Sequence, residues 1–466
     1  MSFLSVNFWY LFTLLCLFLS FIKTVKYKHL LLLLFSYIFY GFGDIKFLFL
    51  LISLSFVAYY FGLKIQNQID QENNPKTYLF FGLMILVSIL GLFKYYDFFV
   101  DSFSRLLHFN SKFTLNLVLP LGISFYTFQA ISYLLDIYYR RVNSSSLTNV
   151  LLYVGFFPQI VCGPILKAHE FLPQLQVNKK LSKQRMYIGL QFILFGLFKK
   201  LVIADRLGVA VDSVYSSPLE YSGLSLLVVA IGYAIQIYCD FSGYSNIAIG
   251  VAHILGFNYK KNFNLPYVSS NPSDFWRRWH ISLSTWFRDY VYIPLGGNRK
   301  GSYRTYFNLF LTLILSGLWH GAAWTFILWG ALQGIGVVIH KIIKSKLKII
   351  RTEKSRIIEL ISIFLTVIWI WLLWVPFRAS SIEESFMIVK KILFLEDGIN
   401  YIPVYALIFA PIILLKQFIL YYMNFDNKFC VLKLNRFVAY MYFCFLAVSI
   451  LVFGYFGNTS FIYARF

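Results

Sequence analysis

Long apolar stretches alternate with short polar connections along the whole chain. The apolar stretches lie near residues 3–22, 30–43, 47–63, 78–93, 115–139, 148–166, 187–204, 222–241, 242–257, 305–319, 322–340, 358–377, 401–422 and 437–457. A helix needs about 17 to 25 apolar residues to cross the hydrocarbon core of a bilayer, and several stretches are shorter. The pattern therefore predicts an all-α polytopic membrane protein with about 11 transmembrane helices plus re-entrant or in-plane helices.

Composition supports this class of protein. The 466 residues are 59% hydrophobic and 20% aromatic, and only 13% are charged, whereas soluble domains carry about 25% charged residues. We also expect residues 3–22 to be a retained first span, because they lack a basic leader and a small-residue cleavage site.

The formal net charge of +22 is spread over short loops between the apolar stretches. These loops are residues 23–29, 258–262, 276–280, 298–304 and 340–356. Cytoplasmic loops of membrane proteins carry such an excess of lysine and arginine, and anionic lipid headgroups are their natural neighbours. The distribution therefore predicts contact with membrane lipids and argues against nucleic acid as a partner.

Residues 258–304 differ from the rest, since they are too polar to span and too aromatic for a free loop. Prolines 266, 272 and 294 and the pair Gly296–Gly297 interrupt the segment. Within residues 274–290, five large apolar side chains recur at helical spacing: Phe275, Trp279, Leu283, Trp286 and Tyr290. This spacing predicts a helix lying in the membrane interface. Irregular backbone near a membrane is tolerated where it lines a cavity, so we expect a pocket here on the cytoplasmic side.

The stretch "SGLWHGAAWTF" (316–326) places His320 inside an apolar run. As a helix, residues 305–319 cover about 22 Å, which is less than the ~30 Å hydrocarbon core. With basic loops on both sides of 305–339, the chain must turn back near Gly317 and Gly321. This predicts a helical hairpin with His320 deep in the protein.

An ionisable residue there is a candidate functional residue, and a desolvated neutral imidazole can act as a general base. His280, on the pocket-forming segment, is the second candidate.

Other candidate groups are the carboxylates in apolar surroundings. Asp205–Arg206 and Arg288–Asp289 are expected to neutralise each other locally, whereas Asp136 and Asp240 are expected to hold a distant arginine or histidine. The five cysteines (Cys16, Cys162, Cys239, Cys430 and Cys444) form no CxxC pair. We therefore expect no metal site and no bound cofactor.

Several stretches resemble the membrane-bound O-acyltransferase family. The resemblance is closest to the bacterial branch that contains the alginate O-acetylation membrane protein and the peptidoglycan O-acetyltransferase membrane subunit. The similar stretches are residues 121–140, 156–165, 196–207, 238–267, 275–301 ("FWRRWHISLSTWFRDYVYIPLGGNRKG"), 315–334 ("LSGLWHGAAWTFILWGALQG"), 374–379 and 461–466. Residues 1–115 match only in hydropathy. We therefore expect one membrane domain over residues 1–466, with residues 1–115 as peripheral helices and 116–466 as the core.

The resemblance implies a ring of tilted helices around a central funnel that opens to the cytoplasm. It implies that His320 is the catalytic base and His280 a second, supporting catalytic position. The anionic donor, expected to be acetyl-CoA, would be held by further residues of this region: Arg277, Arg278, Lys260, Lys261, Trp279, Trp286, Asn298, Arg299, Lys300, Trp319 and Asp240. For the six basic residues among them, the alternative is a role in topology and headgroup contact.

The implied reaction is O-acetylation of a cell-envelope polysaccharide, with peptidoglycan as the first choice. Relatives pass the acyl group to a separate extracytoplasmic protein of the SGNH-hydrolase type, and they reside in the bacterial cytoplasmic (inner) membrane as multi-pass proteins. The alternatives are O-acetylation of alginate or another exopolysaccharide, D-alanylation of teichoic acid, acylation of a lysolipid, and, as a different class, a proton-coupled transporter or flippase.

Overall fold

The computed structural model describes residues 2–108, 113–160, 163–346, 355–423, 436–457 and 461–462. Throughout these ranges the regular structure is helical, and one isolated bridge joins Tyr221 to Ile399. The chain forms two compact units, residues 1–193 with 244–260, and residues 194–243 with 261–466. Two helices, α10 (Lys183–Leu197) and α12 (Gly223–Ile254), contribute residues to both. Cys162, Cys430 and residues 463–466 of the tail motif lie outside the described residues.

The predicted all-α polytopic class is confirmed. Within the described ranges, seven helical stretches are long and apolar enough to cross a membrane: Ile45–Asp70, Lys76–Lys94, Lys183–Tyr215, Gly223–Ile254, Trp324–Lys346, Arg356–Arg378 and Val404–Tyr422. Three shorter apolar helical stretches add to them, Val6–Phe21, Leu147–Ile160 and Phe437–Phe453. The seven are fewer than the roughly 11 full spans predicted from length. One reason is that α15 (Gly301–His320) carries Arg304 and Asn308 in its first half.

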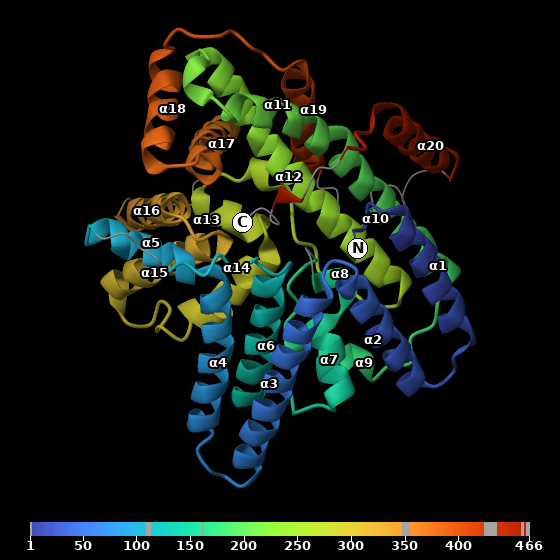
Figure 1. The fold of residues 1–466 in the computed structure, drawn as a ribbon. Helices are drawn as coiled ribbons and strands as arrows, with labels where there is room; N and C mark the ends of the chain where they lie inside the picture. Colours follow the sequence, from blue (N-terminus) through green and yellow to red (C-terminus); the bar gives the residue numbers. More distant parts are fainter. Residues whose placement is uncertain are drawn as a thin grey trace. The chain divides into compact units, whose positions relative to one another are not determined.

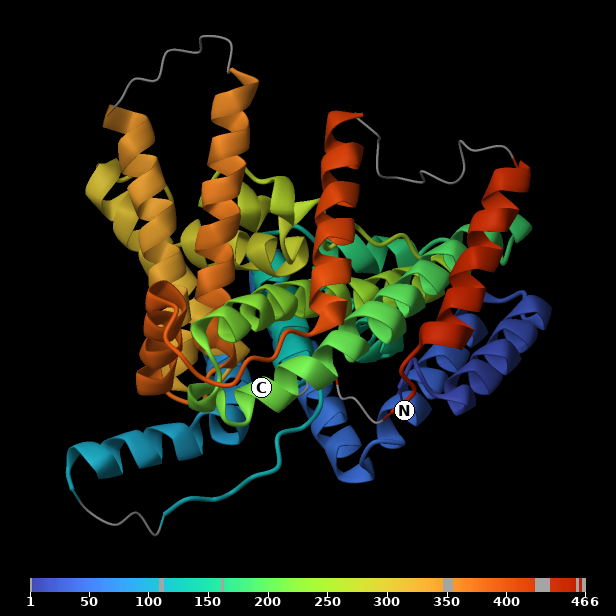
Figure 2. The ribbon, with the colours of Figure 1, turned by 90° about the horizontal axis from the view of Figure 1, so that it is seen from above.

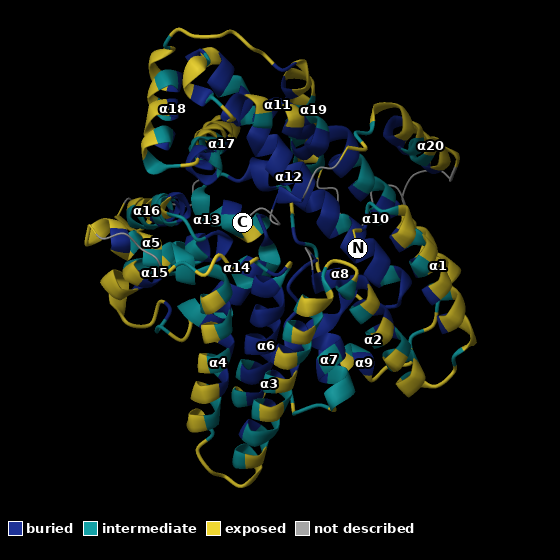
Figure 3. Ribbon diagram, viewed as in Figure 1, coloured by how far each residue is buried: buried dark blue, intermediate teal, exposed yellow. Residues whose placement is uncertain are grey.

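The first unit is built from the N-terminal helices: α1 (Val6–Phe21), α2 (Val25–Gly41), α3 (Ile45–Asp70), α4 (Lys76–Lys94), α5 (Tyr96–Leu106), α6 (Ile123–Tyr138), α7 (Leu147–Gly155), α8 (Phe157–Ile160) and α9 (Ala168–Leu175). Helices α3, α4 and α6 pack side by side (Figure 1). Figure 3 shows that α6 is buried over most of its length, whereas α4 exposes one face. One buried polar group of α6 has a partner inside the unit, since the Ser132 hydroxyl lies 2.7 Å from the Tyr153 hydroxyl.

The second unit holds the remaining elements: the π-helical η1 (Phe198–Ala204), α11 (Asp205–Tyr215), η2 (Pro218–Glu220), η3 (Pro266–Val268), α13 (Pro272–Arg278), α14 (Ile281–Phe287), the π-helical η4 (Arg288–Tyr292), α15 (Gly301–His320), α16 (Trp324–Lys346), α17 (Arg356–Arg378), α18 (Ile382–Phe394), α19 (Val404–Tyr422) and α20 (Arg436–Phe453). The predicted helical hairpin is present, because α15 ends at His320 and α16 begins at Trp324. Helix α17 packs against α16 (Figure 2).

Glycines bring the two helices of this hairpin together. A Cβ on Gly317 would lie 2.3 Å from the Phe326 carbonyl oxygen, and one on Gly330 would lie 2.5 Å from the Leu313 carbonyl oxygen. A Cβ on Gly321 would lie 2.1 Å from the Phe326 ring. Small residues that let helix backbones approach closely are typical of membrane helix pairs. The turn that carries His320 therefore requires glycine at these three positions.

Two predicted boundaries are wrong. Residues 222–241 and 242–257 were expected as two segments, but α12 runs unbroken from Gly223 to Ile254. Polar residues lower the hydropathy at the join without ending the helix, because Asp240 and Ser242 have partners in the protein. The helix that contains the apolar stretch 47–63 continues as far as Asp70, and the Gln66 amide donates to the Asp70 carboxylate one turn later.

The interface helix predicted over 274–290 is also wrong as a single element. The chain forms α13 and α14 instead, separated at His280, whose φ of 40° is in the left-handed region. The break is held by a second segment, because the Ile281 N–H donates to the Asn262 carbonyl and the Asn264 N–H donates to the Arg278 carbonyl. All five large apolar side chains of the predicted stripe are nevertheless buried.

We predict that Gly317→Ala destabilises the protein, whereas Gly91→Ala does not. The new methyl group at 317 forces a backbone shift, and overpacking typically costs about 1–3 kcal/mol. At Gly91, within α4, nothing lies within 4 Å of the new Cβ, and alanine is favoured over glycine inside a helix by about 0.5–1 kcal/mol. Thermal unfolding of the two purified variants measures the difference; equal midpoints would show that the close approach at Gly317 does not matter.

Candidate functional site

His320 is the last residue of α15, and only 4% of its surface is exposed. Three aromatic rings surround the imidazole, with centroids 5.0 Å (Trp319), 5.1 Å (Trp329) and 5.3 Å (Phe377) away, and all three meet it edge to face. They come from α15, α16 and α17. The imidazole is thus held in one orientation inside an apolar cage.

This cage continues as a packed aromatic cluster. The Trp374 ring stacks on Trp329 with centroids 5.7 Å apart and lies 5.1 Å from Trp279. Trp279 in turn stacks on Phe275 at 5.4 Å. Through these contacts Trp279, one of the predicted binding residues, belongs to the packing that supports the cage. It makes no ring contact with His320 among those recorded for the described residues.

His280 lies next to the same cage. It is 1% exposed, and its ring is 4.5 Å from Phe241 and 6.0 Å from Trp319. The Trp319 ring therefore neighbours both histidines. Burial lowers the pKa of His280 to about 3, so its imidazole is neutral at physiological pH. The structure thus brings together three residues singled out from the sequence: His280, Trp319 and His320.

A buried ion cluster lies in the same unit. The Lys200 ammonium is 2.7 Å from a carboxylate oxygen of Asp205 and 2.7 Å from one of Asp240. The second Asp240 oxygen accepts from the backbone N–H of Ile462, at 2.8 Å. Asp240 directly precedes Phe241, the ring that contacts His280. The expectation that Asp240 holds a distant basic group is confirmed, with lysine in place of the predicted arginine or histidine.

The other carboxylate predictions have mixed outcomes. Asp136 is fully buried and binds the His169 imidazole at 2.8 Å and the Arg141 guanidinium at 3.2 Å, as predicted. The Arg288–Asp289 pair is confirmed at 2.7 Å. The Asp205–Arg206 pair is wrong, because Asp205 turns to Lys200. Arg206 instead donates to the Phe453 carbonyl and the Tyr405 hydroxyl.

The remaining predicted binding residues lie elsewhere in the contact network. Arg277 and Arg278 both pair with Asp274, at 3.2 and 2.8 Å, and Trp286 packs on Tyr290. Asn298, Arg299 and Lys300 are exposed on the loop that the Asn308 amide anchors through the Leu295 and Gly297 carbonyls. Lys260 belongs to the first unit and pairs with Glu170.

Sequence reasoning missed the residues that complete the site: Trp329, Phe377, Lys200 and Ile462. Trp329 and Phe377 lie in stretches that carried the family resemblance, but an aromatic residue in an apolar helix gives no signal of its own. Across the described ranges there is no group of three or more His, Cys, Asp or Glu side chains that could hold a metal ion.

Comparison with known proteins adds independent findings. The model of the membrane-bound O-acyltransferase family matches residues 32–377. The probable alginate O-acetylase of Pseudomonas aeruginosa is 37% identical over 83% of this chain and 73% of its own length. The peptidoglycan O-acetyltransferase of Helicobacter pylori is 37% identical over 80% and 75%. The teichoic acid D-alanyltransferase of Bacillus subtilis is 32% identical over 47% and 58%.

We predict that His280 makes the protein less stable as the pH falls. The unfolded state binds a proton near pH 6.5, whereas the folded state does so only near pH 3. Stability from neutral His280 is thus fully present above pH 6.5 and falls below it by up to about 1.4 kcal/mol per pH unit. The His280→Asn variant should lack this pH-dependent contribution to the free energy of unfolding. Unfolding free energies of both proteins at pH 8, 5.5 and 4.5 test this, and parallel pH dependences would contradict it.

We predict strong coupling between Lys200 and Asp240. Lys200→Met leaves two buried carboxylates without their cation, and breaking a buried pair costs about 3–5 kcal/mol. In Lys200→Met/Asp240→Asn one of those charges is gone, so the double variant should be more stable than the sum of the single losses implies. A double-mutant cycle on unfolding free energies measures the coupling. Additive losses would mean that the two side chains act independently.

Proposed function

Since the chain belongs to the membrane-bound O-acyltransferase family, we propose that it takes an acetyl group from acetyl-CoA for O-acetylation of a cell-envelope polysaccharide. The observation that carries the proposal is the position of His320. A buried histidine stands at the end of a helix in an aromatic cage, next to a second buried histidine. The family assignment favours an enzyme over the transporter or flippase considered from the sequence.

In the proposed reaction His320 is the general base. Its ring nitrogen takes the proton of the accepting hydroxyl as the oxygen attacks the acetyl carbonyl carbon. A new C–O bond forms, the C–S bond of the thioester breaks, and the thiolate of coenzyme A leaves and is protonated. The aromatic cage excludes water, which protects the thioester from hydrolysis and holds the imidazole in place. His280 and Trp319 are proposed to position this ring and the substrate.

The extent of similarity supports acetyl as the transferred group. The two acetylating relatives align with 83% and 80% of this chain, whereas the D-alanyltransferase aligns with 47%. The alginate and peptidoglycan enzymes are equally similar to the chain, so the final acceptor class that they share is proposed: a hydroxyl of an envelope polysaccharide. Peptidoglycan is the first acceptor to test.

Several further features belong to this proposal through the family resemblance. The protein would reside in the bacterial cytoplasmic membrane, and acetyl-CoA would reach His320 through a funnel from the cytoplasm. The exposed cations Arg299 and Lys300 would meet the donor's phosphates at the mouth. The acetyl group would then pass to a separate extracytoplasmic protein of the SGNH-hydrolase type, which esterifies the polysaccharide.

We predict that His320→Asn removes O-acetylation, whereas His108→Asn does not. Loss of a positioned general base lowers the rate by about 10²- to 10⁴-fold. His108 is exposed and has positive φ, a conformation that asparagine tolerates, so the same substitution there is a matched control. Base-labile acetate on isolated peptidoglycan and on other envelope polysaccharides is measured in cells with equal membrane levels of each protein.

The fraction that loses acetate identifies the acceptor. If acetate is unchanged in every fraction and ester-linked D-alanine on teichoic acid falls instead, the donor assignment is wrong. If neither ester changes in His320→Asn, His320 is a structural residue and the proposed mechanism is wrong.

A further inference from the structure

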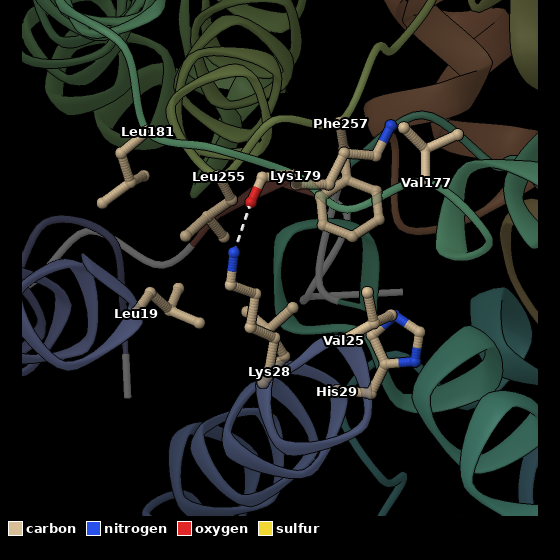
Figure 4. A pocket seen from close by; sticks show the side chains of 10 residues that line it. Leu19, Val25, Lys28, His29, Val177, Lys179, Leu181, Leu255 and Phe257 are labelled. Atoms are coloured by element: carbon tan, nitrogen blue, oxygen red, sulfur yellow. Dashed lines mark hydrogen bonds between the residues drawn. The ribbon is translucent and has the colours of Figure 1, made fainter. Parts of the chain in front are cut away.

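A pocket in the first unit joins an apolar wall to a cationic rim (Figure 4). The wall is formed by buried side chains of α1, α2 and the segment after α12: Leu19, Leu32, Leu255 and Phe257. The rim carries Lys28, in the first turn of α2, and Lys179, on the connection between α9 and α10. A ligand that fits here needs both an apolar part and a negative charge.

The cations around this pocket have only neutral partners. Lys28 donates to the Asn178 side-chain oxygen at 2.8 Å and to the Lys179 carbonyl at 2.6 Å. The Lys179 ammonium lies 5.7 Å from the centre of the Phe257 ring. Arg185 donates to the Asn258 side-chain oxygen at 3.2 Å. Within the described residues, none of the three cations forms an ion pair with a carboxylate.

The local sequence explains why these cations have no carboxylate partner. Residues 20–32 contain three lysines, residues 171–190 contain three lysines and one arginine, and neither segment contains an aspartate or glutamate. Arg185 repels the Lys179 ammonium, and after partial burial this repulsion is the second cause that lowers the pKa of Lys179. An anion bound beside Lys179 would offset the repulsion from Arg185.

We propose that this pocket binds one anionic phospholipid, with the phosphate between Lys28 and Lys179 and an acyl chain along the apolar wall. An ammonium group has three N–H donors, and Lys28 uses two of them on the protein, so one remains for a phosphate oxygen. The apolar wall distinguishes a lipid from a free phosphate, because only a lipid fills both parts of the site. This site is independent of the proposed acyltransferase chemistry.

Native mass spectrometry of the delipidated full-length protein in detergent tests this site. Phosphatidylglycerol is the probe, phosphatidylcholine is the zwitterionic control, and glycerol 3-phosphate is the headgroup without chains. A basic residue near an anionic surface is worth about fivefold in affinity, so Lys28→Gln/Lys179→Gln should bind phosphatidylglycerol about 25-fold more weakly. Lys46→Gln/Lys76→Gln removes two exposed lysines of the same unit and should leave binding unchanged.

Two further variants keep the test decisive if the double glutamine variant folds poorly. Lys28→Arg/Lys179→Arg keeps both charges and should retain binding. Val177→Glu adds a negative charge at an exposed position of the rim and should lose it. Equal binding of phosphatidylglycerol by wild type and Val177→Glu would overturn the proposal. So would equal binding of phosphatidylcholine, or competition by glycerol 3-phosphate at the concentration at which the lipid binds.

Discussion

The backbones of α15 and α16 approach each other where Gly317 and Gly330 meet, more closely than any side chain would permit. This approach determines what surrounds His320, because the hairpin turn follows within a few residues and Gly321 lies against the Phe326 ring. Helix α16 then presents Trp329 and α17 presents Phe377 to the imidazole. The placement of His320, the proposed general base, therefore depends on the glycine one turn before it.

Three ionic side chains of the second unit are buried together. Lys200, Asp205 and Asp240 form a compact cluster, and the cluster also receives the backbone N–H of Ile462 near the C-terminal end of the chain. Buried charges are costly unless paired, so such a cluster ties distant segments to one arrangement. Asp240 and Phe241 are adjacent in α12, and Phe241 is in contact with His280. The ion cluster and the candidate active site are therefore supported by the same turn of helix.

Sequence reasoning predicted most of the helices and the burial of His320 at the hairpin turn. Hydropathy and helical spacing mark apolar segments and apolar faces, so the hairpin and the aromatic stripe in 274–290 were predictable. The break at His280 was not predictable, because it depends on two hydrogen bonds with a separate segment: the Asn262 carbonyl accepts one and the Asn264 N–H donates the other. The same holds for Asp205, whose neighbour in sequence is Arg206 but whose partner in space is Lys200. Contacts between distant segments leave no periodic pattern, and the residues missed were those that depend on such contacts.

The most direct test of the central claim is the release of free thiol from acetyl-CoA by purified protein in detergent, without any ion gradient, under single-turnover conditions. Wild type should release thiol. His320→Gln, which keeps a polar side chain of similar size, should be slower by about 10²-fold or more. Equal rates in both proteins would contradict the assignment of His320 as the base. Absence of release by wild type, with the accepting partner present, would contradict acetyl-CoA as the donor.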